Sequence, residues 1–176
     1  MYLFSNDRIA IASTKDTDEI RLLLNSAYRG DTSKKGWTTE ADLIQGEVRT
    51  DEASLLKVMN QPGSVFLKYT DDAQHIIACV NLQKQDRKVY LGMFSVSPLL
   101  QGGGIGKKLL QAAEEYAHQI NGIAIYMSVI SVRTELIDWY KRYGYVDTGK
   151  RIAFEEDNVS GRHVKKLEFM VLEKAL

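Results

Sequence analysis

Residues 88–130 carry the pattern that most restricts how this chain of 176 residues can fold. A strand-like run, Lys88–Val96, precedes a glycine-rich segment, and apolar residues at helical spacing then continue to Ile120. The almost wholly apolar run Ile123–Ile130 comes next and is typical of a strand covered on both faces. A strand–helix–strand unit pairs its two strands in parallel through a right-handed crossover. The sequence therefore predicts an α/β fold built around this unit.

The segments on either side predict further strands and helices. Alternating or apolar runs between turn residues indicate strands at Arg8–Ala12, Ser64–Thr70, Gln74–Gln83, Tyr145–Phe154 and Lys165–Leu172. Helical spacing and capping residues indicate helices after Thr14–Asp16 and over Thr39–Ile44, Asp51–Met59 and Thr134–Tyr143, with loops at Gly30–Gly36 and Glu155–Arg162. We expect a single domain over residues 1–176, with a mixed sheet between helices.

Composition excludes several classes of ligand and partner. The 23 basic and 23 acidic residues balance to zero without runs of one sign, which argues against a nucleic-acid surface. No apolar stretch approaches the ~18 residues of a membrane span. The lone Cys79 lies in an apolar run, which predicts no intrachain disulfide and a cytoplasmic location. The histidines His75, His118 and His163 are scattered, so we expect no metal site.

The glycine-rich segment Gln101–Lys107 stands where a helix begins. The first amides of a helix lack intrahelical partners, and glycine lets a ligand approach the backbone, so this junction predicts a phosphate site. Two familiar phosphate patterns fail. The nucleotide-triphosphate loop needs glycine where Gln101 stands, and the dinucleotide fingerprint needs it where Lys107 or Leu109 stands. The spacing that remains is Gln-x-x-Gly-x-Gly, formed by Gln101, Gly104 and Gly106.

This spacing resembles the acetyl-CoA loop of the GNAT superfamily of N-acetyltransferases, and the element order is similar to theirs across nearly the whole chain. The resemblance implies a mostly antiparallel sheet of about seven strands, flanked by helices and splayed between the strands before and after the loop helix. It implies acetyl-CoA as co-substrate, with strand backbone beside the pantetheine arm and loop amides around the pyrophosphate. The implied binding residues are Phe94, Ser95, Val96, Gln101, Gly102, Gly103, Gly104, Ile105, Gly106 and Lys107.

A second motif lies downstream, in Trp139-Tyr140-Lys141-Arg142-Tyr143-Gly144-Tyr145. It is similar to the GNAT pattern of an aromatic or aliphatic residue, a tyrosine, three residues, a glycine and an aromatic residue. The resemblance implies that the Tyr140 hydroxyl faces the thioester sulfur. A phenol with an ordinary pKa near ~10 holds its proton at neutral pH and can give it to a departing thiolate. Tyr140 is therefore the candidate catalytic residue.

The positions that could hold a general base depart from those of better-defined relatives. Some GNAT enzymes carry a glutamate where this chain has Tyr90, and others carry one where it has Ser128. Arg133 replaces an asparagine that is often found seven residues before the tyrosine. The general base is therefore unassigned.

For the acceptor, we consider the segment from Tyr28-Arg29-Gly30 through Gly36-Trp37-Thr38-Thr39-Glu40, which offers an aromatic ring at Trp37 and a carboxylate at Glu40. Together they could hold a cationic amine, and Glu40 could accept its proton. The structural alternative is a helix capped by Thr38 or Thr39 with Glu40 in its first turn. Both interpretations expect a helix to begin here.

Three classes of function fit these patterns. The first is an N-acetyltransferase in which a primary amine attacks acetyl-CoA directly. The alternative is a CoA-binding sensor without catalysis, which the missing glutamates favour. A nucleotide-binding protein unrelated to CoA rests on the glycines alone, and the failed fingerprints oppose it. The acceptor is a small-molecule amine or a protein amino group, nucleic acid and membrane are not expected as partners, and a homodimer is plausible.

Overall fold

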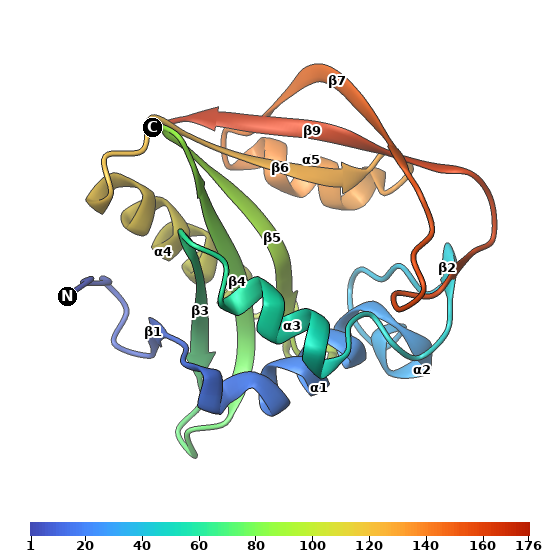
Figure 1. Cartoon of the computed structure of the whole chain (residues 1–176), viewed down its shortest axis with the longest axis horizontal. Coiled ribbons are helices and arrows are strands. Elements are labelled where there is room, and N and C mark those ends of the chain that lie inside the picture. Colours follow the sequence, from blue (N-terminus) through green and yellow to red (C-terminus); the bar gives the residue numbers. More distant parts are fainter.

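The computed structural model describes all residues from 1 to 176. Seven strands form one sheet in the order β1-β3-β4-β5-β6-β9-β7, and only the β5–β6 pair is parallel (Figure 1). This confirms the predicted mixed, mostly antiparallel sheet. The strands are β1 (Ile9–Ile11), β3 (Ser64–Thr70), β4 (Ile76–Gln85), β5 (Lys88–Val96), β6 (Ala124–Ile130), β7 (Val146–Phe154) and β9 (Leu167–Ala175).

The sheet opens between its two parallel strands, β5 and β6. Their pairing covers three positions and ends at Tyr90 and Tyr126, after which the strands separate. Past this point β5 carries a bulge, where its register with β4 shifts and Met93 adopts a left-handed φ of 49°. An extra residue bends the strand that carries it, so the bulge and the separation together shape the opening.

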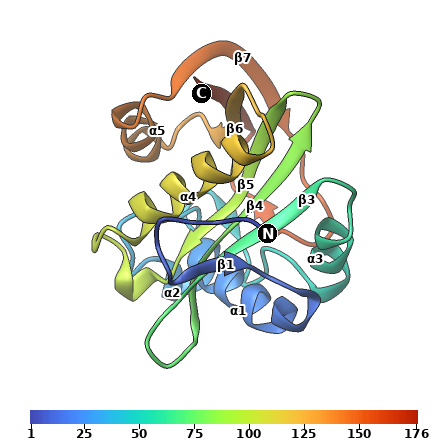
Figure 2. The ribbon, with the colours of Figure 1, turned by 90° about the vertical axis from the view of Figure 1, so that its left-hand side faces the viewer.

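Helices cover both faces of the sheet (Figure 2). The larger core cluster packs α4 (Ile105–Gln119) and α5 (Thr134–Arg142) against one face, and a smaller cluster packs α1 (Thr17–Tyr28) and α3 (Glu52–Met59) against the other. Strand residues alternate between the two clusters, as Val80 and Cys79 do on β4. None of the helices is long and apolar enough to span a membrane.

The region between α1 and α3 differs from its prediction. The expected loop Gly30–Gly36 contains the short helix α2 (Gly30–Ser33), and no helix forms over Thr39–Ile44. Residues 41–43 make a turn instead, and β2 (Ile44–Gln45) pairs with β8 (Arg162–His163), which begins at the end of the second expected loop. Partners more than 100 positions away in the sequence therefore overrule the local helical pattern.

Candidate active site

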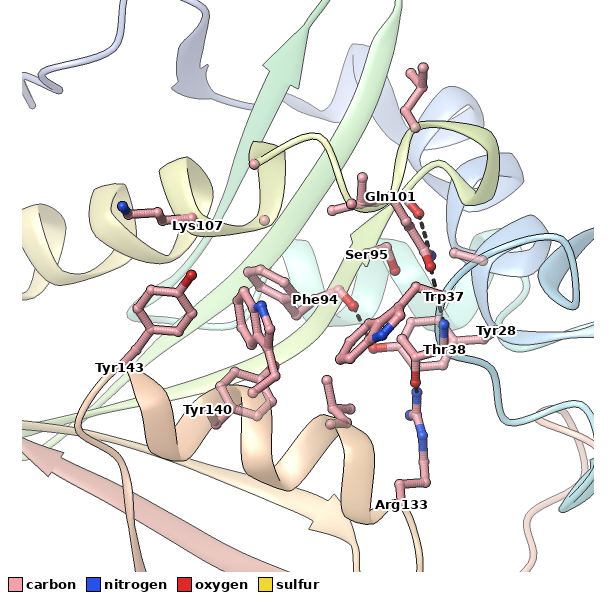
Figure 3. A pocket seen from close by; sticks show the side chains of 18 residues that line it. Tyr28, Trp37, Thr38, Phe94, Ser95, Gln101, Lys107, Arg133, Tyr140 and Tyr143 are labelled. Carbon is pink, nitrogen blue, oxygen red and sulfur yellow. Dashed lines mark hydrogen bonds between the residues drawn. The ribbon is translucent and has the colours of Figure 1, made fainter.

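The opening between β5 and β6 holds a pocket of about 260 Å³, which we call the splay pocket (Figure 3). Its walls come from the end of α1, the segment after α2, the end of β5, the glycine-rich turn and α5. The pocket therefore reaches from the α4–α5 face of the sheet to α1 on the other face. It is lined by Ala27, Tyr28, Trp37, Thr38, Phe94, Ser95, Val96, Leu100, Gln101, Gly102, Gly104, Gly106, Lys107, Arg133, Leu136, Trp139, Tyr140 and Tyr143.

The glycine-rich turn forms an open cradle at the start of α4. Gly102 and Gly104 have φ values of 86° and 84°, a left-handed conformation that side chains disfavour, and nothing lies within 4 Å of the place where either would carry a Cβ. The amides of the first turn of α4 lack intrahelical partners. A phosphate-sized anion can therefore meet backbone N–H groups here without obstruction. Gly103 and Ile105 belong to the same turn but do not line the pocket.

The end of β5 presents backbone groups to the pocket, and two of its carbonyls already have partners within the chain. The Tyr28 hydroxyl donates to the Phe94 carbonyl at 2.8 Å, and the side-chain Nε2 of Gln101 donates to the Val96 carbonyl at 3.1 Å. Between them, the Ser95 side chain is buried and its hydroxyl has no hydrogen-bond partner. A buried polar group without a partner is a natural contact for a polar ligand.

Tyr140 stands in an aromatic wall on α5. Its ring centroid lies 5.1 Å from that of Trp139 and 6.3 Å from that of Phe94. Burial raises the pKa of the Tyr140 hydroxyl far above its ordinary value, and the nearby charge of Arg133 opposes the rise only in part. The hydroxyl therefore keeps its proton at physiological pH.

Residues Gly36–Thr38 form a strap between two walls of the pocket. On the β5 side, the Thr38 amide donates to the Gln101 side chain at 3.3 Å. On the α5 side, the Arg133 guanidinium donates to the Thr38 hydroxyl at 2.7 Å, and this hydroxyl donates to Glu135 at 3.0 Å. Trp37 is half-exposed and lies over the opening (Figure 3).

Glu40 lies outside the pocket and does not share a surface with Trp37, contrary to expectation. Its carboxylate is held between two buried guanidinium groups, with Arg29 at 2.7 Å and Arg133 at 3.0 Å. Arg29 also donates to the Ser160 carbonyl at 2.7 Å, which ties the β7–β8 loop to the end of α1. The alternative prediction, that Glu40 lies in the first turn of a helix, is also wrong, because no helix begins there. Glu40 is therefore part of a structural ion-pair network.

Of the residues predicted to bind a ligand, the pocket brings together Trp37, Phe94, Ser95, Val96, Gln101, Gly102, Gly104, Gly106, Lys107 and Tyr140. The sequence placed Tyr28 at the start of the acceptor segment, but its position at the end of an amphipathic helix gives no local sign of its contact with β5. Arg133, which also lines the pocket, could have been noticed because it replaces the asparagine of the family pattern. No group of three or more His, Cys, Asp or Glu side chains is placed to hold a metal.

Comparison with known proteins identifies related sequences and folds. The model of a family described as acetyltransferase (GNAT) matches residues 16–145. No curated protein matches the sequence significantly. The fold is similar to that of the ribosomal-protein-S18-alanine N-acetyltransferase from Escherichia coli, with a TM-score of 0.70 and 12% identity over 95% of this chain and 92% of that one.

Two further solved structures have similar folds. The ribosomal-protein-alanine N-acetyltransferase from Brucella melitensis has a TM-score of 0.70 and 17% identity, over 96% of this chain and 99% of that one. Ard1 from Thermoplasma volcanium has a TM-score of 0.69 and 20% identity, over 96% of each chain. At such identities, these likenesses concern the fold alone.

Proposed function

Because the chain belongs to the acetyltransferase (GNAT) family, we propose that it transfers the acetyl group of acetyl-CoA to a primary amine. The observation that carries the proposal is the splay pocket, which joins the open glycine cradle to Tyr140 through the parted strands. The cradle suits the pyrophosphate of CoA, and the gap beside β5 suits its narrow pantetheine arm. Ser95 is part of the pocket wall, and its unpartnered hydroxyl is a candidate contact for a polar atom of that arm.

In this proposal the acceptor approaches from the α1 face, opposite α4 and α5. The nitrogen of the amine forms a bond to the thioester carbonyl carbon, and the carbon–sulfur bond then breaks. An N–H of the bulged part of β5 stabilises the oxyanion, and Tyr140 gives its proton to the sulfur. The amine loses one proton to solvent, and Tyr140 recovers one from solvent, so the products are an amide and free CoA.

The acceptor class stays open between a small-molecule amine and a protein amino group. Two of the similar structures are named as ribosomal-protein alanine N-acetyltransferases, which keeps protein amino groups among the candidates. The lone buried Cys79 is consistent with the proposed cytoplasmic location. A homodimer stays a proposal without a specific contact.

One observation favours the second candidate, a CoA-binding sensor without catalysis. Tyr90 and Ser128 occupy the positions where relatives carry a glutamate, and they lie on strands β5 and β6, on the face that α1 covers. Neither side chain is a carboxylate that could take the proton of the amine.

Two measurements separate these functions. Calorimetry tests whether acetyl-CoA binds, and an acetyl-CoA-dependent thiol-release assay over small amines, amino acids, polyamines and peptides tests transfer. Binding together with amine-dependent release supports the enzyme. Binding without release from any acceptor favours the sensor, and absence of binding overturns both.

A further inference from the structure

The backbone of Arg49 is held against α1, on the side from which the acceptor is proposed to approach. It lies between β2 and α3, where the Asn25 side chain accepts hydrogen bonds from the amides of Arg49 at 2.7 Å and Thr50 at 3.0 Å. Asn25 also donates to the Thr50 carbonyl at 3.1 Å. The guanidinium carbon of Arg49 stands 5.5 Å from the centre of the Tyr28 ring. The backbone of Arg49 is therefore fixed to α1, and its charge stands over the ring whose hydroxyl binds β5.

Among the arginines around Tyr28, Arg49 is the one with a free guanidinium. Arg29 and Arg133 share the Glu40 carboxylate, whereas the Arg49 side chain makes no ion pair or hydrogen bond. Asp157 is near Arg49 but makes no ion pair with it. The carboxylate of Asp157 accepts hydrogen bonds from the amides of Val159 at 2.8 Å and Ser160 at 2.6 Å. Burial raises the pKa of Asp157, but these bonds lower it, and they do so more than the charge of Arg49 does. A half-buried guanidinium with unused donors is suited to binding a carboxylate.

Arg49 lies near two tyrosines, Tyr28 and Tyr90, on the face of the sheet from which the acceptor is proposed to approach. Tyr90 stands at the last paired position of β5 and β6, with its ring on the α1 face, and the Arg49 charge partly opposes the rise in pKa that burial gives it. Next to it, a hollow of about 470 Å³ on the same face is lined by Tyr126 and Ser128, among others. The charges that act on Tyr28 are those of Glu40, Arg49 and Arg133, and Glu40 is already neutralised within the network. The uncompensated charge next to Tyr28 is therefore positive, and Arg49 carries it without a partner.

We propose that Arg49 binds a carboxylate of the acceptor, so that the substrate is a small amine that also carries a carboxylate. This inference rests on the proposed acetyl transfer. A guanidinium can hold a carboxylate through two parallel hydrogen bonds, which orients the amine as well as binding it. The same cation repels polyamines and other dicationic acceptors.

The test is the thiol-release assay on the full chain with matched pairs of amines. The acids are glycine, β-alanine and 4-aminobutyrate, which differ in the spacing between amine and carboxylate. Each acid is compared with its amide, which keeps the amine but lacks the negative charge. Arg49→Gln removes the charge, and Arg8→Gln, which disrupts an exposed ion pair with Asp72 directly before β1, is the matched control. We expect wild type and the control to prefer at least one acid over its amide by about tenfold or more in kcat/KM. Arg49→Gln should abolish this preference by lowering the rate with the acid about tenfold more than the rate with its amide.

Two results overturn the inference while acetyl transfer stands. One is turnover of the amides or of 1,4-diaminobutane above that of every acid, and the other is an equal loss with acid and amide in Arg49→Gln. If no amine gives thiol release, the proposed transfer fails instead. Calorimetry of the same acids and amides in the presence of CoA then decides the inference: binding of an acid that Arg49→Gln loses supports it, and its absence refutes it.

Discussion

The two sides of the splay pocket are built by different means. The side proposed for the donor, called the donor side, comprises β5, the glycine-rich turn and α5, and it presents backbone amides, carbonyls and a wall of aromatic rings. The side proposed for the acceptor, called the acceptor side, comprises residues 28–50 and 155–163. It is held by side chains, chiefly the ion pairs that Glu40 makes with Arg29 and with Arg133 at the start of α5, and the strap at Thr38. A surface made of backbone tolerates many sequences, whereas one made of buried charges depends on each partner.

The strongest test of this difference is to remove Glu40, the carboxylate that the two buried arginines share. Glu40→Ala leaves two buried guanidinium groups without their shared carboxylate, and we expect a loss of about 3–5 kcal/mol in the free energy of unfolding, or about 10 °C in Tm. Chemical and thermal denaturation measure it. Glu135→Ala, at the half-exposed partner of Arg133, should cost less than about 1 kcal/mol. Equal losses in the two variants would show that the network is not the main support of the acceptor side.

On the donor side, the largest effect should come from the Tyr140 hydroxyl. Tyr140→Phe keeps the ring in the aromatic wall and removes only the proton donor, so we expect kcat to fall by about 100- to 1,000-fold with little change in the Kd of acetyl-CoA. Tyr116→Phe, which removes a buried hydroxyl on α4 outside the pocket, is the control. Turnover like that of wild type would remove Tyr140 from the role.

A third variant tests whether the donor side depends on backbone shape. Gly104→Val forces a branched side chain into a φ of 84° and fills the open cradle, so the affinity for acetyl-CoA should fall by about 100-fold in calorimetry. Gly149→Val imposes a similar strain, at a φ of 83° on β7, away from the pocket. If both variants lose affinity equally, the loss reports strain rather than contact with the ligand.

The smallest expected effect concerns the hydrogen bond from Tyr28 to Phe94, one of several that join the two sides. Tyr28→Phe leaves the Phe94 carbonyl without its partner, and we expect a cost of about 1–2 kcal/mol in stability and about tenfold in kcat. Tyr116→Phe again serves as the control and should leave kcat unchanged. An unchanged kcat in Tyr28→Phe would mean that the bulge in β5 holds its shape without α1.

Tyr28→Phe and Tyr116→Phe should also differ from wild type in how their stability changes at alkaline pH. Burial raises the pKa of Tyr28 to about 12, and that of Tyr116 also to about 12. An unfolded tyrosine ionises near ~10, so the stability that each protonated hydroxyl contributes is complete below that pH and is lost as the pH rises toward 12. Each variant should show a shallower loss of stability over this range in urea denaturation, whereas only Tyr28→Phe should lose activity.

The contrast between the two sides explains what the sequence could predict. β3 and β5 have the predicted bounds, and the glycine spacing located the cradle, because strand alternation and glycine conformation are local properties of the chain. Glu40 was misplaced because its partner Arg133 is 93 positions away, and the contact of Tyr28 with β5 was missed because Phe94 is 66 positions away. Contacts of this range leave no periodic trace in a single sequence.

The opening between β5 and β6 has a further consequence for how the protein avoids wrong partners. A strand with free amides and carbonyls is a template for pairing with any extended chain, and proteins usually protect such an edge at the rim of a sheet. Here two such edges face each other inside the fold, under Trp37 and beside α5. Tyr28 and Gln101 already occupy two carbonyls of β5, and the pocket between the edges holds about 260 Å³. This space favours a narrow ligand over a further strand with its side chains, so the protein limits wrong pairing by what fits in the gap.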